Sequence, residues 1–159
     1  MADLTFRIDA QMASAAKTVV RARGFEMIVD EPVSLGGTDS APNPVEYVLA
    51  AFAGCLNVMG NLIAKEMAFE LRGLDIRIRG ELNPARLFGT SDADRAGYKS
   101  ITVEMIPDCD ADAATLEAWL HAVEARCPVS DNVQNSTPVT VLLGSSDGRA
   151  FRSREAVAR

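Results

Sequence analysis

Alternating and clustered apolar positions predict three strands in the first 30 residues. Residues 4–8 alternate apolar and polar side chains, which is the period-two pattern of a half-buried strand. Residues 10–16 are small and polar and predict a loop. Two apolar, partly β-branched runs follow at 17–22 and 25–29, and we expect two strands joined by a tight turn there.

The same pattern returns in the second half of the chain. Residues 74–79 alternate leucine or isoleucine with charged residues, so we expect a strand with one face in water. After a polar loop at 83–97, residues 98–106 predict a partner strand that Pro107 closes. A last strand is expected at 139–143.

A second helix is predicted between these last two strands. Asp112 can cap its start, and Cys127-Pro128 ends it because proline cannot continue the helical hydrogen-bond ladder. An apolar stripe at relative positions 0, 3, 4 and 7 would face the core. It consists of Leu116, Trp119, Leu120 and Val123. With the first helix, described next, the element order is ββ(β)-α-ββ-α-β, which is typical of an α+β domain.

Several signals agree on a long helix that starts at residue 43. Asn43 is suited to the N-cap, Pro44 to the first helical position, and Glu46 to the third residue of a capping box. No proline interrupts the segment up to about Met67.

This helix is apolar on nearly every side, which predicts that it is buried on every side. Its large apolar residues are Val45, Val48, Leu49, Phe52, Leu56, Met59, Leu62 and Ile63. One small domain rarely surrounds such a helix alone. We therefore expect a partner subunit to cover part of it.

The length of 159 residues favours one domain, which we place at residues 1–143. Residues 144–159 are polar and carry several arginines, so a basic C-terminal tail is expected there. A net charge of −6 argues against nucleic acid as a partner, because phosphate binding needs a basic face. The single histidine, His121, leaves no multi-histidine metal site, and no cofactor is predicted.

Cysteine use and apolar content predict a cytoplasmic location. Three widely spaced cysteines without a CxxC pair do not form a secreted disulfide framework. The first residues lack the basic and apolar regions of a signal peptide. The most apolar stretch, 47–59, is shorter than the about 20 residues of a bilayer span, so no membrane association is expected.

The three cysteines differ in their surroundings. Cys55 lies within the long apolar helix, where a free cysteine usually acts as a small core residue. Cys127 lies at a helix C-terminus, whose dipole opposes thiolate formation, and it therefore suits a resolving thiol better than a first nucleophile. Cys109 stands between two aspartates that would raise its pKa, and we interpret it as incidental. His121 fits a surface or boundary histidine.

Five short motifs together resemble the OsmC/Ohr family, closest to its broad OsmC-like branch. The match in order and spacing spans about residues 17–143, and the two cysteine motifs are its most specific part. The motifs are Asp-Glu-Pro at 30–32, Gly-Gly at 36–37, Asn-Pro-Val-Glu-Tyr at 43–47, Ala-Gly-Cys-Leu at 53–56 and Arg-Cys-Pro-Val at 126–129.

The resemblance implies an intertwined α+β homodimer, with antiparallel sheets around long central helices and reaction sites at the subunit interface. It also implies reduction of organic hydroperoxides by two cysteines. Cys55 matches the peroxidatic position, which becomes a sulfenic acid. Cys127 matches the resolving position, and a dithiol reductant would restore both thiols.

In the Ohr branch an arginine held by a glutamate favours the thiolate. The position of that glutamate holds Val45 here, Glu46 follows one residue later, and no arginine occurs at 10–16. Glu46 and Cys55 are roughly 13 to 14 Å apart along one helix, so they could meet only across two antiparallel helices of a dimer. Glu46 could equally serve only as a cap of its own helix.

Two hypotheses remain open at this stage. The first is a thiol-dependent peroxidase for organic hydroperoxides, with Cys55, Cys127 and Glu46 as its site residues. The second is a non-catalytic protein of the same fold that binds a small apolar ligand at the dimer interface. Retention of both thiols favours the first, and Val45 with the unmatched arginine favours the second.

Overall fold

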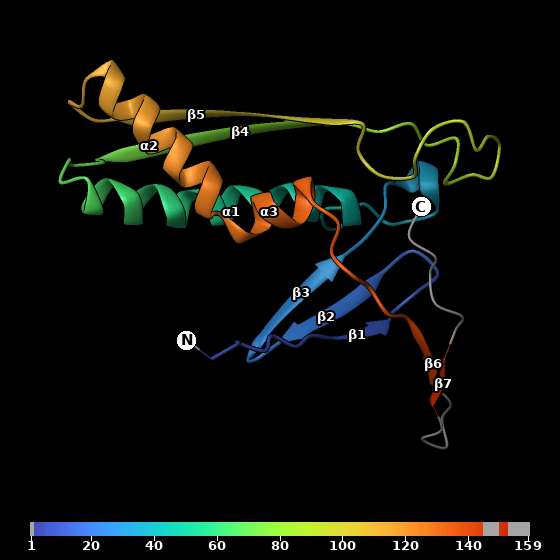
Figure 1. Cartoon of the computed structure of the whole chain (residues 1–159). Helices are drawn as coiled ribbons and strands as arrows, with labels where there is room; N and C mark the ends of the chain where they lie inside the picture. Colours follow the sequence, from blue (N-terminus) through green and yellow to red (C-terminus); the bar gives the residue numbers. More distant parts are fainter. Residues whose placement is uncertain (1, 145–149, 153–159) are drawn as a thin grey trace.

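A computed structural model of the chain describes residues 2–144 and 150–152 (Figure 1). The architecture is α+β with antiparallel sheets, as expected. Its elements in chain order are β1 (Asp9–Met12), β2 (Thr18–Ala22), β3 (Phe25–Val29), a 3-10 turn (Val33–Leu35), α1 (Pro44–Glu66), β4 (Gly73–Glu81), β5 (Ser100–Asp108), α2 (Ala113–Arg126), α3 (Pro128–Gln134), β6 (Leu142–Gly144) and β7 (Ala150–Arg152).

The first sheet has the order β1-β2-β3 and stands apart from the helices (Figure 1). The two strands expected at 17–22 and 25–29 are confirmed. The strand expected at 4–8 is wrong, since β1 lies in the segment expected to be a loop. The alternating side chains of residues 4–8 are largely exposed, so the amphipathic pattern finds no covering surface among the described residues.

The second sheet is the long hairpin of β4 and β5, whose inward side chains face α1. In its register Ile76 lies opposite Met105 and Ile78 opposite Val103. The expectation that Pro107 closes the second strand is wrong, because β5 continues to Asp108. Proline is tolerated on an edge strand, and β5 is bonded to β4 alone.

The helix α1 runs along this hairpin (Figure 1), and its capping box is confirmed. Asn43 accepts a hydrogen bond from Glu46 N, and Glu46 accepts one from Asn43 N. At 23 residues, α1 has the length and apolar character of a membrane span. Its buried residues nevertheless contact α2 and β4, as those of a core helix do.

The chain beyond α2 departs from the sequence-based expectation. Asp112 caps α2 as predicted, but a third helix, α3, follows directly at Pro128. Proline at a first helical position starts a helix as readily as it ends one. The strand expected at 139–143 is limited to β6, which pairs with β7 in the segment expected to be a tail. Most of the remaining tail lies outside the described residues.

The core lies between α1, α2 and the hairpin. Trp119 of α2 is 2% exposed, and its indole N–H donates to Gly60 O of α1 at 2.9 Å. A Cβ on Gly60 would stand 3.1 Å from the Trp119 ring, so glycine permits this close approach. Other members of the core are Phe52, Leu56, Ile63, Ala64, Val123 and Cys127.

Part of the α1 surface is open in the described part of the chain. Val45, Val48, Val58 and Leu62 are exposed, although the sequence predicts that the helix is covered all round. The chain's own α2, α3 and hairpin therefore cover one part of α1 and leave large apolar side chains for another surface.

Candidate active site

The fold brings two cysteines that are 72 residues apart in the sequence into direct contact. The Cys127 thiol donates to the Cys55 sulfur, and the two Sγ atoms lie 3.0 Å apart. Both are free thiols in this structure. A disulfide bond is about 2.0 Å long, so the pair needs only a small movement to form one.

Packing of α2 and α3 onto α1 creates this contact. Cys55 lies midway along α1 and is partly buried, whereas Cys127 is 1% exposed at the junction of α2 and α3. Cys127 ends α2, as the sequence predicts, and it also begins α3. Its sulfur also caps α3 and accepts the N–H of Ser130 at 3.3 Å.

The electrostatic surroundings keep the Cys127 thiol protonated. Burial is the main cause that raises its pKa, the hydrogen bond to Cys55 adds to it, and the N–H groups of α3 oppose it in part. Arg126, the adjacent cation, is paired with Glu66 at the end of α1 through two hydrogen bonds. The ion pair of Arg126 with Glu66 therefore links the ends of α1 and α2.

Glu46 does not approach Cys55 of its own chain. Glu46 lies nine residues before Cys55, and its carboxylate accepts a hydrogen bond from Asn43 N within the capping box. The Tyr98 hydroxyl donates to Val45 O in the same helical turn. Burial, with the negative charge of Glu46 nearby, raises the pKa of the Tyr98 phenol. Capping is thus the one role of Glu46 that this chain displays.

The remaining candidate residues lie elsewhere. Cys109 is partly buried beside Asp108 and Asp110, both of which bind Arg72. His121 is exposed on α2, as a surface histidine would be. Among residues 2–144 and 150–152, no three His, Cys, Asp or Glu side chains gather in a way that could hold a metal ion.

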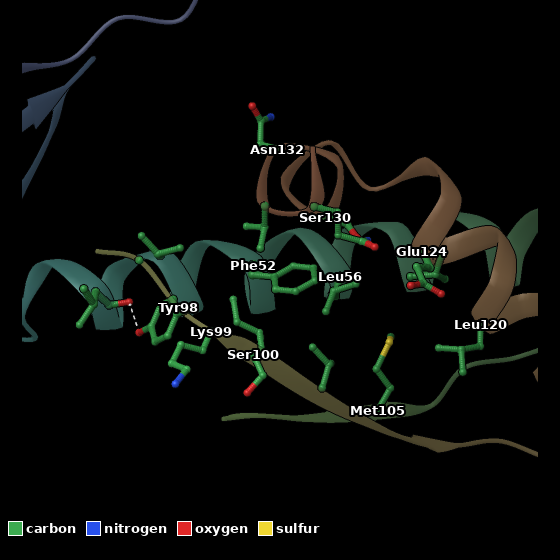
Figure 2. A pocket seen from close by; sticks show the side chains of 18 of the residues that line it. Phe52, Leu56, Tyr98, Lys99, Ser100, Met105, Leu120, Glu124, Ser130 and Asn132 are labelled. Carbon is green, nitrogen blue, oxygen red and sulfur yellow. Dashed lines mark hydrogen bonds between the residues drawn. The ribbon is translucent and has the colours of Figure 1, made fainter. Parts of the chain in front are cut away.

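A groove of about 910 Å³ opens between α1, β5, α2 and α3 (Figure 2), and neighbours of the two cysteines line it, although neither cysteine does. Phe52 and Leu56 line it from α1, and Met105 and Leu120 line the opposite side. Leu56 follows Cys55 directly, and Ser130 is the residue whose N–H binds Cys127. Sequence reasoning did not assign the groove, because the residues that line it come from four separate elements.

A second buried ionisable group, Asp30, also escaped the sequence analysis. Its side chain is fully buried beneath the loop before α1 and accepts from backbone or hydroxyl groups of Glu31, Thr38 and Ser40. Lys17 lies 3.4 Å away. The hydrogen bond from the Thr38 hydroxyl is the main cause that holds the Asp30 pKa well below its usual range. The Asp-Glu-Pro motif was the available signal, but it did not reveal the donors.

The family model for OsmC-like proteins matches residues 37–142, and its span contains both cysteines of the contact. The chain belongs to the OsmC-like family. No protein of curated function matches it.

Solved OsmC-like structures share the fold at low sequence identity. An OsmC-like protein from Mycoplasma pneumoniae is 17% identical, with a TM-score of 0.74 over 84% of this chain and 90% of its own. The organic hydroperoxide resistance protein OsmC from Legionella pneumophila is 19% identical, with a TM-score of 0.61 over 85% and 93%. An organic hydroperoxide resistance protein from Elizabethkingia anophelis is 16% identical, with a TM-score of 0.61 over 85% and 91%.

In this OsmC-like chain, the structure unites two of the three predicted site residues. Cys55 and Cys127 are in contact, and Glu46 lies apart at the start of α1. The separation is the one that helix geometry requires for two residues on a single helix. A catalytic part for Glu46 stays a prediction that depends on a second subunit.

Proposed function

We propose that this OsmC-like protein reduces organic hydroperoxides through a cycle of Cys55 and Cys127. The observation that carries the proposal is the contact of their sulfur atoms at 3.0 Å. Two solved relatives of the same fold are named organic hydroperoxide resistance proteins, which supports the substrate class. The apolar groove, which Leu56 next to Cys55 and Ser130 next to Cys127 help to line, favours an organic hydroperoxide over hydrogen peroxide.

The proposed cycle has three balanced steps. The Cys55 thiolate attacks the terminal peroxide oxygen, the O–O bond breaks, and the products are a sulfenic acid and an alkoxide that takes up a proton. The Cys127 thiol then condenses with the sulfenic acid to form a disulfide and water. A dithiol reductant finally exchanges with the disulfide, restores both thiols and becomes a disulfide itself. Because the cycle needs reduced thiols between turnovers, we also propose a cytoplasmic location.

A homodimer forms part of the proposal. The β1–β3 sheet stands apart from the helical body, and large apolar residues of α1 are exposed, so both surfaces are suited to a second copy of the chain. If the two α1 helices run antiparallel, Glu46 of each copy approaches Cys55 of the other. Substitution of Glu46 by Gln keeps the capping box and removes the charge. Loss of turnover in Glu46→Gln with an unchanged melting temperature would support a catalytic role for Glu46. Unchanged turnover would mean that Glu46 acts only as a helix cap.

The decisive experiment measures consumption of cumene hydroperoxide with dithiothreitol as the reductant. We expect turnover in the unaltered protein and in Cys109→Ser, and none above background in Cys55→Ser. In Cys127→Ser, one equivalent of hydroperoxide should leave a sulfenic acid that dimedone traps on Cys55. Equal rates for the unaltered protein and Cys55→Ser would contradict the proposal.

The groove supports one alternative function, the binding of a small apolar ligand without turnover. Its volume of about 910 Å³ lies within the usual range for small-molecule pockets. Val45 and the unmatched arginine favour this reading over the peroxidase. It predicts that an apolar fluorescent probe binds equally well to the unaltered protein and to Cys55→Ser, while neither consumes hydroperoxide.

A further inference from the structure

Cys55 needs a partner that stabilises its charged form. The thiolate is the reactive species, and partly apolar surroundings disfavour it unless a cation or a hydrogen-bond donor is close. The Cys127 thiol is placed to act as such a hydrogen-bond donor. Among the described residues, the Cys127 thiol is the one group that donates a hydrogen bond to the Cys55 sulfur. The nearby Arg126 is held by Glu66.

The geometry of Cys127 suits a donor. Its sulfur accepts the N–H of Ser130, which takes up a lone pair and leaves the S–H free to point toward Cys55. Ser130 is itself 1% exposed, and its hydroxyl accepts from Gln134, so the start of α3 is held in place. Packing and the Ser130 hydrogen bond thus orient the Cys127 thiol.

We propose that the S–H of Cys127 stabilises the Cys55 thiolate by a hydrogen bond, in the place that a cation takes in other activated cysteines. The inference rests on the proposed function and gives Cys127 a part in the first step as well as in the second. The charge belongs on Cys55 because that residue is partly open to solvent, whereas Cys127 is 1% exposed. Charging the more deeply buried sulfur would cost more desolvation.

Two substitutions of Cys127 separate the donor from the resolving thiol. Serine keeps a hydroxyl donor, alanine has none, and both prevent the disulfide. Each is made in the Cys109→Ser background, so that Cys55 is the one thiol left. The rate of alkylation by iodoacetamide is then measured against pH, with no hydroperoxide present. A failure of the peroxidase proposal therefore leaves this result intact.

We expect alkylation of Cys55 at pH 7 to be about tenfold slower with alanine than with serine at position 127. The reason is that losing a hydrogen bond to the charged sulfur lowers the fraction of thiolate by about that factor. The pH midpoint should rise by about one unit with alanine. Equal midpoints for the two variants would overturn the inference. Melting curves by circular dichroism establish that both variants are folded.

A second measurement needs no change at Cys127. In Cys109→Ser, thiolate absorbance should rise with pH in two separate steps, because the shared proton holds the second thiol neutral until higher pH. A single step that releases both protons together would also overturn the inference. The amplitude of the first step should correspond to one thiolate for each chain.

Discussion

Asp30 and Cys127 are both almost completely buried, yet their surroundings are opposite. The Asp30 carboxylate accepts hydrogen bonds from five donor groups of three residues, and Lys17 lies beside it. Cys127 has only the backbone N–H groups at the start of α3 and one thiol neighbour within an apolar core. The pKa of Asp30 is accordingly lowered, whereas that of Cys127 is raised.

The difference shows that donors, rather than burial alone, decide whether a buried group is charged. Desolvation acts against the charged form at both sites. At Asp30 the hydrogen bonds outweigh desolvation, and the charged carboxylate holds the loop before α1 in place through these bonds. At Cys127 they do not, and the neutral thiol keeps a proton that it can donate. One site is held by polar contacts and the other by packing.

The largest effect is expected where the packing of α2 on α1 holds the thiol pair together. Trp119→Ala removes the side chain that fixes α2 against Gly60 of α1. Truncation of a buried tryptophan costs about 3–5 kcal/mol, and the contact between Cys55 and Cys127 should loosen with it. The substitution removes the chain's single tryptophan and with it the fluorescence signal, so urea unfolding is followed by circular dichroism. Peroxide-driven disulfide formation should slow in parallel.

Phe88→Ala is the matched control, because Phe88 is an aromatic residue that is 57% exposed. Its effect on stability should stay within about 0.5 kcal/mol. If the two variants lose similar stability, packing through Trp119 does not hold α2 in place.

The polar site should respond to the loss of one charge. Asp30→Asn replaces an acceptor by an amide whose N–H₂ faces the N–H groups of Thr38 and Ser40. We expect the melting temperature to fall by roughly 5 °C or more. Asp39→Asn is the control, since Asp39 is exposed in the same loop and asparagine tolerates its positive φ of 53°. Similar melting temperatures for the two variants would contradict the role of Asp30.

The pH dependence gives the sign of this contribution. Because folding lowers the Asp30 pKa, its stabilisation is present above the unfolded value near 4 and is lost as pH falls further. The difference in stability between the unaltered protein and Asp30→Asn should therefore shrink below about pH 4. A difference that stays constant with pH would mean that shape, not charge, matters at this position.

The contrast between the two sites also explains which features could be predicted from the sequence. The helix α1 was predictable because the cap, the proline and the apolar pattern all act locally. The strand at 4–8 failed because an alternating pattern needs a partner surface, which residues 2–144 and 150–152 do not supply. The helix α3, at seven residues, was too short to show a period.

The candidate site was predictable only in part for a similar reason. The proximity of Cys55 and Cys127 depends on the docking of α2 on α1, which no local pattern encodes, and the expectation came from the resemblance. The donors to Asp30 are spread over residues 31–40 in an irregular loop. Backbone donors there carry no signal in residue identity. The groove likewise depends on four elements that meet only in three dimensions.

A smaller effect should separate packing from helix propensity on α1. Gly60→Ala places a Cβ 3.0 Å from Leu74, so we expect a loss of about 1–2 kcal/mol despite the better propensity of alanine. Gly54→Ala meets no atom within 4 Å in this chain and should stabilise by up to about 1 kcal/mol. Urea unfolding at one fixed protein concentration compares them. A loss for Gly54→Ala that depends on concentration would indicate that a second copy covers that face.

The last effect is an alkaline loss of stability at the thiol site, opposite in sign to the acid loss at Asp30. Folding raises the Cys127 pKa, so its neutral form stabilises the protein fully below the unfolded value near 8.5. As pH rises further, the unfolded chain loses this proton first, and stability falls by up to about 1.4 kcal/mol for each pH unit. Urea unfolding of the reduced protein between pH 7 and 10 should show this decline. Cys127→Ser, whose hydroxyl does not titrate in that range, should show a smaller one, and Cys109→Ser serves as the thiol control. Equal declines for the unaltered protein and Cys127→Ser would mean that the buried thiol is not the group that responds. The asymmetry between a carboxylate held charged and a thiol held neutral would then need another cause.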